Sequence, residues 1–294
     1  MKSLKEEIKK GKILVSDGAW GTFLQKKGLE PGECPEYWNL IKRDSVLEIA
    51  QSYIDAGADI ILTNSFGASP HKLKHYKLEN QAWEINKAAA QISRDAAGDK
   101  FVLGSIGPTG AILMMGDVTE EEIFNGFKLQ AQALEEGGAD AICIETMSDI
   151  HEALLAVKAA KEYTKLEVVC TFTFHSTVAG DYKTMMGISP AEMANALIGA
   201  GADIIGSNCG NGFEQIIDIV KAIRKENGTI PILVHANAGK PFVENNQTIF
   251  PETPQMMAER VNELINCGVN IIGGCCGTTP DHILALSNKI KSLS

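Results

Sequence analysis

The amino-acid sequence predicts an α/β fold, a closed (β/α)8 TIM barrel formed by a single domain. Three observations favour it: one phrase recurs four times, eight apolar strand-like runs alternate with helical segments, and no linker divides the 294 residues. Eight β–α units in succession are typical of a closed parallel barrel rather than of two open-sheet domains. We therefore interpret residues 1–294 as one barrel, with a helical extension over about residues 1–11.

The recurring phrase combines a glycine, a short polar step and an apolar run that ends in polar or sulfur-containing residues. Its copies are AGADIILTNSFG (Ala56–Gly67), GGADAICIETM (Gly137–Met147), AGADIIGSNCG (Ala200–Gly210) and CGVNIIGGCCG (Cys267–Gly277). Glycine is expected just past a helix because it adopts the left-handed conformation without a Cβ clash. Continuous apolar runs are typical of strands buried on both faces. Each copy therefore predicts a helix end followed by a parallel strand.

Four further apolar runs complete the eight strands: Lys12–Gly18, Lys100–Gly107, Leu166–Phe174 and Pro231–Gly239. Between the strands, Ser, Thr or Asp followed by Pro or acidic residues indicates where helices begin. We expect such beginnings at Asp44 or Ser45, Thr119, Ser189 and Thr253. Strands and helices thus alternate along nearly the whole chain.

Composition and charge exclude several classes of protein. Lys and Arg total 27 against 37 Asp and Glu, and the net charge of −10 disfavours nucleic acids and anionic membranes as partners. No run approaches the ~20 apolar residues of a membrane span, and the N-terminus lacks a signal-peptide core. The seven Cys do not have the spacing of a secreted disulfide framework. We expect a cytoplasmic protein with free thiols or metal-bound Cys.

Three Cys lie at predicted strand ends, where the active site of such a barrel forms. Cys209 follows the sixth strand, and Cys275 and Cys276 follow the eighth. Adjacent Cys on an extended strand would point to opposite faces, but the flanking glycines allow the backbone to leave strand geometry. Three thiolates favour zinc and leave a fourth tetrahedral position open, which is the pattern of a catalytic site.

The residues alone leave two other interpretations of these thiols open. In one they are buried free thiols, since Cys is among the most buried residue types. In the other, Cys275 and Cys276 form a redox pair or strained disulfide, against which a reducing compartment argues. The other Cys are interpreted as thiols without partners: Cys34, Cys143, Cys170 and Cys267.

Two acidic residues and a glycine-rich turn also lie at strand ends. Asp17 follows the first strand and Glu145 the fourth, and each carboxylate is suited to accept hydrogen bonds from an amino-acid ammonium group. The turn at Gly104–Gly110 offers backbone N–H groups to a carboxylate. A thiol bound to zinc loses its proton and stays nucleophilic, so the whole set favours alkyl transfer to a thiol.

These motifs resemble the homocysteine S-methyltransferase family, above all the homocysteine-binding domain of cobalamin-dependent methionine synthase. They are, in chain order, DGAWGT, TNSFGAS, GSIGPTG, ETM, SNCGNG, ANAGKP and GGCCGTTP, and the resemblance runs from about Lys12 to Leu293. It implies a TIM barrel whose zinc is held by three Cys, with homocysteine as the fourth ligand. The implied zinc ligands are Cys209, Cys275 and Cys276.

The resemblance also implies roles for four further residues. Asn237 matches a weak oxygen ligand that homocysteine displaces. Asp17 and Glu145 match the positions that bind the homocysteine amino group, and the Ser105 region matches its carboxylate contacts. Trp20 departs from the family, which often has Met or a small residue at this position.

The sequence therefore predicts zinc-dependent transfer of a methyl group to the thiol of homocysteine, giving methionine. The sequence contains no D-x-H-x-x-G corrinoid motif, so methylcobalamin would arrive on a separate corrinoid protein. Alternatives are S-methylmethionine, betaine or another small donor, or a different thiol acceptor. Betaine is disfavoured because Gly67 follows Phe66 where betaine-using relatives carry Tyr. An alternative of another class is a non-catalytic thiol- or zinc-binding module of a methyl-transfer complex.

Overall fold

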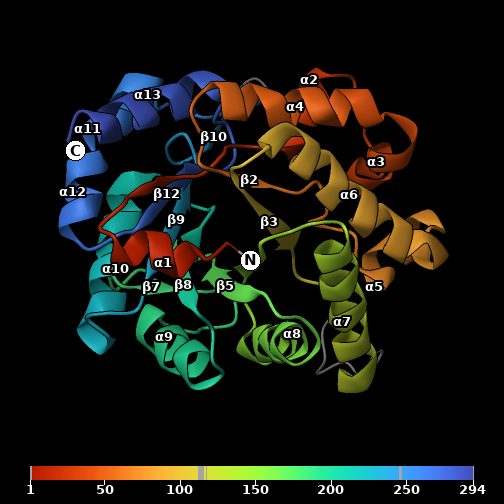
Figure 1. The fold of residues 1–294 in the computed structure, drawn as a ribbon. Helices are drawn as coiled ribbons and strands as arrows, with labels where there is room; N and C mark the ends of the chain where they lie inside the picture. Colours follow the sequence, from red (N-terminus) through yellow and green to blue (C-terminus); the bar gives the residue numbers. More distant parts are fainter. Residues whose placement is uncertain (1, 112–115, 117, 245–246, 294) are drawn as a thin grey trace.

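The computed structural model describes residues 2–111, 116, 118–244 and 247–293, and Figure 1 shows a ring of helices around a central sheet. Eight parallel strands form this sheet, which confirms the predicted TIM barrel. The strands are β1 (Leu14–Val15), β2 (Ile60–Leu62), β3 (Phe101–Ile106), β4 (Ala141–Met147), β5 (Glu167–Phe172), β8 (Ile204–Asn208), β9 (Ile232–Ala236) and β12 (Ile271–Gly274).

The barrel closes between its first two strands. The paired order is β1-β12-β9-β8-β5-β4-β3-β2, and a parallel bridge between Ser16 and Ile60 joins its two ends. The backbone N–H of Asp59 also donates to the Val15 carbonyl at 2.7 Å. All eight predicted strand segments therefore lie side by side in one closed sheet.

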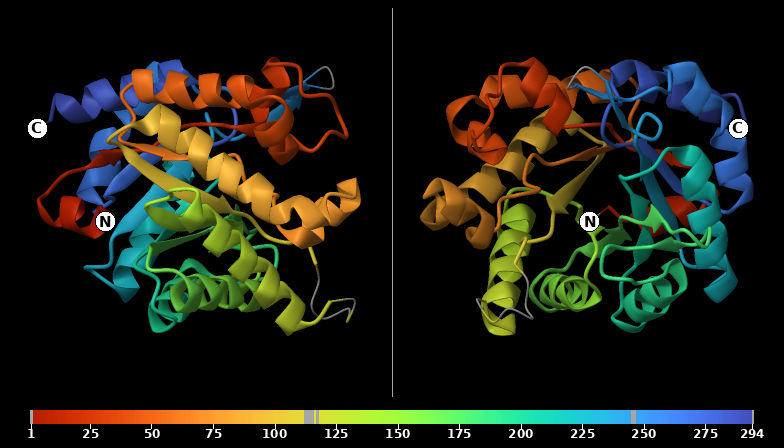
Figure 2. Two further views of the ribbon diagram at one scale, coloured as in Figure 1. Left: turned by 45° about the vertical axis from the view of Figure 1, so that its right-hand side comes forward. Right: turned by 180° about the vertical axis from the view of Figure 1, so that it is seen from behind.

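Each strand is followed by at least one outer helix, and the right-hand view in Figure 2 shows this ring from behind. The outer helices are α4 (Arg43–Asp55), α6 (Ala82–Ala97), α7 (Glu120–Glu136), α8 (Ile150–Tyr163), α9 (Pro190–Gly199), α10 (Phe213–Glu226), α11 (Pro254–Glu259), α12 (Val261–Asn266) and α13 (Pro280–Lys291). Shorter elements lie in the connections: α2 (Gly21–Lys26), η1 (Pro35–Tyr37), α3 (Trp38–Ile41), α5 (Pro70–Leu73), η2 (Lys74–Tyr76), η3 (Glu79–Gln81), and the hairpins β6 (His175–Ser176) with β7 (Tyr182–Lys183) and β10 (Phe242–Glu244) with β11 (Gln247–Ile249).

The predicted helix beginnings are confirmed at Thr119, Ser189 and Thr253, whose side chains each accept a backbone N–H of the first turn. The beginning at Asp44 or Ser45 is wrong. Helix α4 begins at Arg43, because α3 runs directly into it and Lys42 takes the capping position without a side-chain bond. The helix expected after Thr253 is interrupted at Arg260, where α11 ends before α12 begins.

The recurring phrase makes the same contact in all four copies. Its glycines have positive φ angles at Gly57, Gly138, Gly201 and Gly268, as a helix end requires. Before each strand, an Asp or Asn side chain accepts the backbone N–H of a residue in the preceding strand. These bonds join Asp59 to Val15 (3.1 Å), Asp140 to Val102 (2.9 Å), Asp203 to Val168 (2.9 Å) and Asn270 to Ile232 (2.9 Å). The repeat therefore clamps successive strands together at their N-terminal ends.

The inside of the barrel changes from apolar to polar along the strands. Its apolar part includes Leu14, Leu103, Cys143, Val169 and Leu233. Because inward positions recur every second residue, the next inward layer toward the C-terminal ends is polar. That layer contains Ser105, Glu145, Thr171, Asn208 and His235, all buried.

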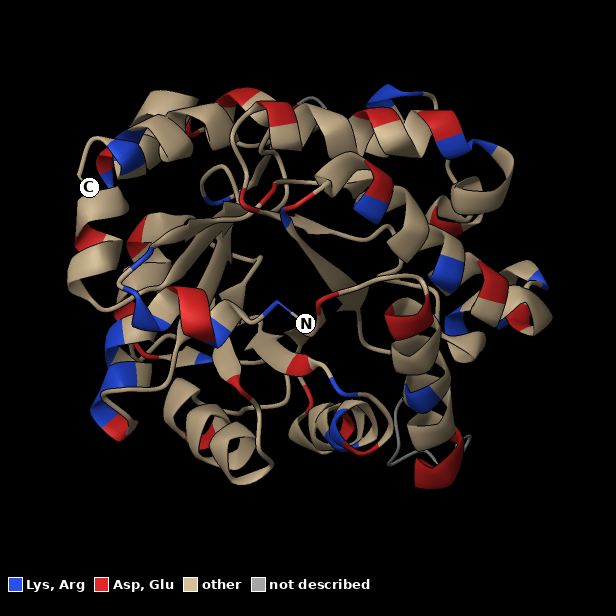
Figure 3. Cartoon of the chain, in the orientation of Figure 1, with Lys and Arg blue, Asp and Glu red and all other residues tan. Residues whose placement is uncertain are grey.

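The helical extension forms α1 (Leu4–Lys9) and seals the N-terminal end of the barrel. Leu4 is buried in the apolar interior, and its backbone N–H donates to Glu167 at 2.7 Å. Lys5 forms an ion pair with Asp203 at 2.5 Å. Figure 3 shows acidic and basic residues interspersed over the outer helices. Among the residues that the structure describes, none of the helices has the length and apolar character that crossing a membrane requires.

Candidate active site

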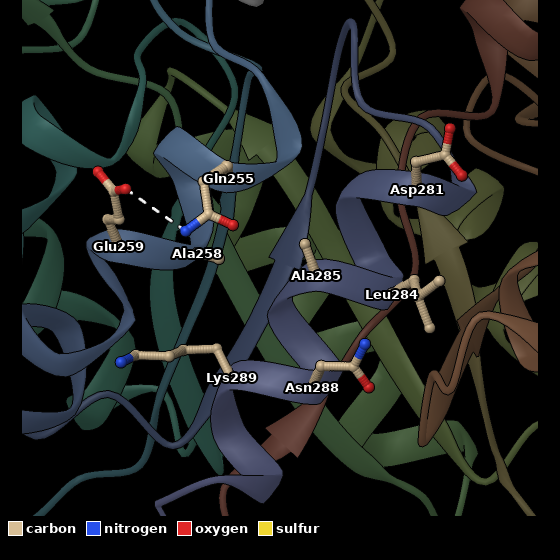
Figure 4. Close-up of a pocket in the computed structure, with 8 residues that line it drawn as sticks. All are labelled: Gln255, Ala258, Glu259, Asp281, Leu284, Ala285, Asn288 and Lys289. Atoms are coloured by element: carbon tan, nitrogen blue, oxygen red, sulfur yellow. Dashed lines mark hydrogen bonds between the residues drawn. The ribbon is translucent and has the colours of Figure 1, made fainter.

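A cavity of about 300 Å³ opens at the C-terminal ends of the strands. We call it the mouth cavity; six of the seven predicted site residues line it: Asp17, Ser105, Glu145, Cys209, Cys275 and Cys276. A separate groove of about 450 Å³ lies on the outer ring between α11 and α13, and its lining includes Gln255 and Glu259 of α11 and Leu284 and Asn288 of α13 (Figure 4). None of the predicted site residues lines that groove, so the predicted chemistry gathers in the mouth cavity.

The three predicted cysteine ligands meet at one wall of the cavity. Their sulfur atoms all lie within 4.8 Å of one another, and Cys209 Sγ is 3.9 Å from Cys276 Sγ. Cys209 follows β8 directly and has a φ angle of 59°. Cys275 and Cys276 follow β12, and the next residue, Gly277, has a φ angle of 81°. Both Cys segments thus leave strand geometry, as the flanking glycines predicted for the vicinal pair.

Hydrogen bonds between the three sulfur atoms shift their pKa values in opposite directions. Hydrogen bonds from Cys275 and Cys276 hold the pKa of the Cys209 thiol well below its ordinary value. The same hydrogen bonds to Cys209, together with burial, raise the pKa values of the Cys275 and Cys276 thiols. The cluster therefore favours one thiolate and two thiols, and a bound cation would favour release of the remaining protons. No other group of the described residues brings together three side chains suited to a metal.

Asp17 is buried beside Trp20 at the end of β1, and its backbone carbonyl accepts the N–H of Gly274, the residue before Cys275, at 2.8 Å. Its Oδ2 atom accepts hydrogen bonds from Trp20 Nε1 at 2.8 Å and from the backbone N–H of Leu62 at 2.9 Å. Burial raises the pKa of Asp17 to about 7, although these hydrogen bonds oppose the shift. The Oδ1 atom has one long contact, with Ser16 Oγ at 3.3 Å, which leaves it able to accept a ligand donor.

Glu145 lies in the polar inner layer near the end of β4. Ser105 Oγ donates to its Oε1 atom, and Asn208 Nδ2 lies 3.5 Å from its Oε2 atom. Burial, together with the negative charges of Asp17 and Cys209, raises the pKa of Glu145 to about 7, although the hydrogen bond from Ser105 opposes the shift. The Ser105 hydroxyl is directed to Glu145, and the contact of the Ser105 region with a ligand carboxylate stays a prediction.

Asn237 lies next to Cys209 and does not line the cavity. Its side chain donates a hydrogen bond to Cys209, while none of the described residues donates to its buried Oδ1 atom. His235 lines the cavity, and burial lowers its pKa to about 4, so the ring is neutral. Its buried Nε2 atom is likewise without a partner among the described residues.

The four remaining Cys lie outside the cluster. Cys143 and Cys170 are buried in strands, and Cys267 is partly buried after α12. The prediction that these thiols lack partners is wrong for Cys34, which donates a hydrogen bond to Glu36 at 3.4 Å. Both residues are buried and lie two positions apart in the connection between β1 and α4, which brings the thiol close to the carboxylate.

Comparisons with other proteins agree with this geometry. A family model described as homocysteine S-methyltransferase matches residues 14–290. The chain belongs to the homocysteine S-methyltransferase family. Methionine synthase of Mycobacterium leprae (strain TN) is 30% identical over 289 residues, which cover 92% of this chain and 24% of that protein. Methionine synthase of Mycobacterium tuberculosis (strain ATCC 25618 / H37Rv) is 29% identical over 96% of this chain and 25% of that protein.

The chain thus spans about a quarter of the length of these curated relatives. Among solved structures, the metallated form of the Escherichia coli homocysteine methyltransferase MmuM matches with a TM-score of 0.80 and 24% identity, covering 97% of this chain and 99% of that one. Its apo form matches with a TM-score of 0.75. Both have the same fold, and the predicted family membership is confirmed by the family model.

Two residues of this homocysteine S-methyltransferase barrel had no predicted role. Glu36 lines the mouth cavity, and its Oε1 atom accepts the backbone N–H of Gly67 at 2.6 Å. A single acid in an irregular connection has no sequence pattern that would reveal this position. Asn208 was recognisable as a strand-end residue next to Cys209, but only the folded chain places its amide beside Glu145.

Proposed function

We propose that the chain transfers a methyl group to the thiol of homocysteine, giving methionine, with zinc held by Cys209, Cys275 and Cys276. One observation carries the proposal: a cluster of three sulfur atoms faces the same cavity as two buried carboxylates. The sulfur cluster suits the thiol of the substrate, and the carboxylates suit its ammonium group. Membership of the homocysteine S-methyltransferase family supports the assignment.

The cysteine residues fit a zinc ion. Tetrahedral zinc with Zn–S bonds of about 2.3 Å separates its sulfur ligands by roughly 3.8 Å. The 3.9 Å between Cys209 and Cys276 is close to that separation. The buried Oδ1 atom of Asn237, next to the cluster, suits the weak oxygen ligand of the substrate-free site. When bound, zinc would lower the pKa of the substrate thiol while leaving its sulfur nucleophilic.

The chain's own residues supply orientation and exclusion of water. Asp17 and Glu145 bind the substrate ammonium group, and this positive charge offsets the cost of holding two buried carboxylates in one cavity. The cavity wall formed by Trp20 and Phe66 covers the bound amino acid. The sulfur is thereby held in one place for attack on the methyl group.

For the donor, we propose a methyl-corrinoid carried by a separate protein. The resemblance of the sequence motifs to the homocysteine-binding domain of cobalamin-dependent methionine synthase supports this choice, together with the similarity to proteins named methionine synthase. A donor screen tests it: zinc-loaded protein and homocysteine are combined with methylcobalamin, S-methylmethionine, betaine or adenosylmethionine. Methylation by methylcobalamin is expected, whereas turnover only with S-methylmethionine would replace the proposed donor. Thermal stabilisation by homocysteine without turnover on any donor would favour the non-catalytic binding module.

Replacement of Cys276 tests the metal and the activity together. Cys276→Ala is expected to lose stoichiometric zinc and methyl transfer, measured by elemental analysis and by methionine formation. Cys267→Ala is the matched control, since this thiol is also partly buried but lies outside the cluster. Retained zinc and full activity in Cys276→Ala would contradict the proposed function.

A further inference from the structure

Two residues of the candidate site have backbone conformations that side chains other than glycine rarely adopt. Thr146, next to Glu145, has a φ angle of 62°, and Cys209 has a φ angle of 59°. A left-handed conformation is a marked outlier for a β-branched residue such as Thr. Such conformations persist where the surroundings fix them, and they concentrate at functional sites. Thr146 forms hydrogen bonds with the buried side chain of Asn208, and Cys209 is the residue that follows Asn208 in the sequence.

The Asn208 amide uses its full hydrogen-bonding capacity. Its Oδ1 atom accepts the backbone N–H of Thr146 at 2.8 Å and the hydroxyl of Thr171 at 2.7 Å. Its Nδ2 atom donates to the hydroxyl of Thr146 at 2.7 Å and faces Glu145 Oε2 at 3.5 Å. Asn208 is fully buried, so loss of the amide would leave several of these groups without partners.

The contact with Thr146 explains how Glu145 is directed into the cavity. The pairing of β4 with β5 shifts register between Ile144 and Met147, as in a β-bulge. A bulge removes a backbone N–H from the ladder and re-aims the neighbouring side chain. Here the Asn208 amide accepts the Thr146 N–H in place of a strand carbonyl. Asn208 thereby holds the bulge that orients the Glu145 carboxylate.

The backbone of Asn208 fixes the position of Cys209. The Asn208 carbonyl accepts the hydroxyl of Thr173 at 2.8 Å, and the Cys209 N–H donates to the His235 carbonyl at 2.9 Å. The peptide that joins Asn208 to Cys209 is therefore held on both sides. The side chain of Asn208 is hydrogen-bonded to Thr146 in β4, and its backbone continues into Cys209. Asn208 therefore connects the Glu145 carboxylate to the Cys209 sulfur.

We propose that Asn208 is a positioning residue that sets the Glu145 carboxylate and the Cys209 sulfur in one fixed geometry. An amino-acid thiol has its ammonium group and its sulfur at a limited separation, so both ends must be met together. The inference rests on the proposed function for the identity of the ligand. It differs from a packing role because it couples substrate affinity to metal retention.

Asn208→Ala tests the coupling in the zinc-loaded full chain. We expect KM for homocysteine to rise about tenfold, with a smaller change in kcat, and zinc loss to a chelator to accelerate about tenfold, as is usual when support for a ligand is removed. Asn86→Ala is the matched control: Asn86 is also fully buried and donates to two backbone carbonyls, but it lies in α6 away from the cavity. It is expected to lower Tm without changing KM or zinc loss.

A second variant separates positioning from general damage to the fold. Glycine adopts the conformation of Thr146 without strain, so Thr146→Gly in the Asn208→Ala background is expected to restore part of the homocysteine affinity. The inference is overturned if Thr146→Gly restores no homocysteine affinity and if Asn208→Ala has the same KM and the same rate of zinc loss as Asn86→Ala. Zinc loss is measured without turnover, so a wild-type chain that proves inactive refutes the proposed function while the chelator assay still decides the role of Asn208.

Discussion

The two ends of the barrel are built in opposite ways. At the N-terminal end, the four Asp or Asn clamps repeat one contact, and α1 covers an apolar interior with its charged groups paired. At the C-terminal end, two buried carboxylates and three partly buried thiols line one cavity, and among the described residues the buried Nε2 atom of His235 in its lining and the buried Oδ1 atom of Asn237 beside Cys209 have no partner. The regular end stabilises the fold, whereas the irregular end holds groups that a ligand would satisfy.

The largest expected contrast concerns the pH dependence of stability. The pKa of Asp17 rises from 3.8 to about 7 on folding, so between these values the folded chain holds a proton that the unfolded chain releases. Stability therefore falls as the pH rises through this window. Asp17→Asn removes that loss and is expected to raise the free energy of unfolding at pH 8 by up to about 4 kcal/mol, at roughly 1.4 kcal/mol per pKa unit, with little gain at pH 4.

Asp203 at the other end provides the control of opposite sign. Burial opposes the shift, but hydrogen bonds from Lys5 and Lys161 lower its pKa, so its contribution stabilises the fold above the unfolded pKa and is lost as the pH falls through the folded value. Asp203→Asn is expected to destabilise the chain at pH 8. Urea unfolding at pH 4 and pH 8 checks both variants, and a loss of stability in Asp17→Asn at pH 8 would contradict the contrast.

Removal of the α1 seal is the next largest effect. Leu4 is 1% exposed in the apolar interior, and Leu4→Ala is expected to lower the free energy of unfolding by about 3 kcal/mol through lost burial and a cavity. KM for homocysteine should stay unchanged, because the mouth cavity lies at the other end of the strands. Leu293→Ala, at a 47% exposed position near the C-terminus, is the control with little expected change. A raised KM in Leu4→Ala would show that the two ends are coupled.

The same division explains what the sequence could predict. The strands repeat, so the four copies of one phrase and the four further apolar runs were enough to place the strands in a barrel and to bring Cys209 to the same end as Cys275. The start of α4 was missed because the preceding α3 overrides the local signal of Asp44. The orientation of Ser105 toward Glu145 depends on contacts between separate strands. No local pattern encodes such contacts.

At the C-terminal end, Glu145→Gln is expected to weaken binding of homocysteine. A charged hydrogen bond to an ammonium group contributes about 2 kcal/mol, which corresponds to a KM roughly 30 times higher. Glu152→Gln is the matched control, since this buried carboxylate on α8 accepts hydrogen bonds from Thr109 and does not line the cavity. Steady-state kinetics measures both variants. An equal KM for the two would remove Glu145 from the proposed binding site.

The smallest expected effect concerns the indole of Trp20, which contacts both the mouth cavity and the apolar interior of the barrel. Its ring packs against the interior residues and lines the mouth cavity, while its N–H donates to Asp17 Oδ2 at 2.8 Å. Trp20→Phe keeps an aromatic wall but removes the donor, so Asp17 loses one of the bonds that hold its carboxylate. A hydrogen bond of this kind contributes about 1 kcal/mol, and KM for homocysteine is expected to rise about fivefold with kcat nearly unchanged.

Trp38→Phe supplies the control for Trp20, because Trp38 is also an indole near the same end of the chain. It is 1% exposed, and its Nε1 atom has no hydrogen-bond partner among the described residues. Its replacement removes an indole without removing a bond, so any change should appear in Tm rather than in KM. If Trp20→Phe and Trp38→Phe change KM equally, the indole acts only as packing, and the orientation of Asp17 comes from the backbone N–H of Leu62 instead.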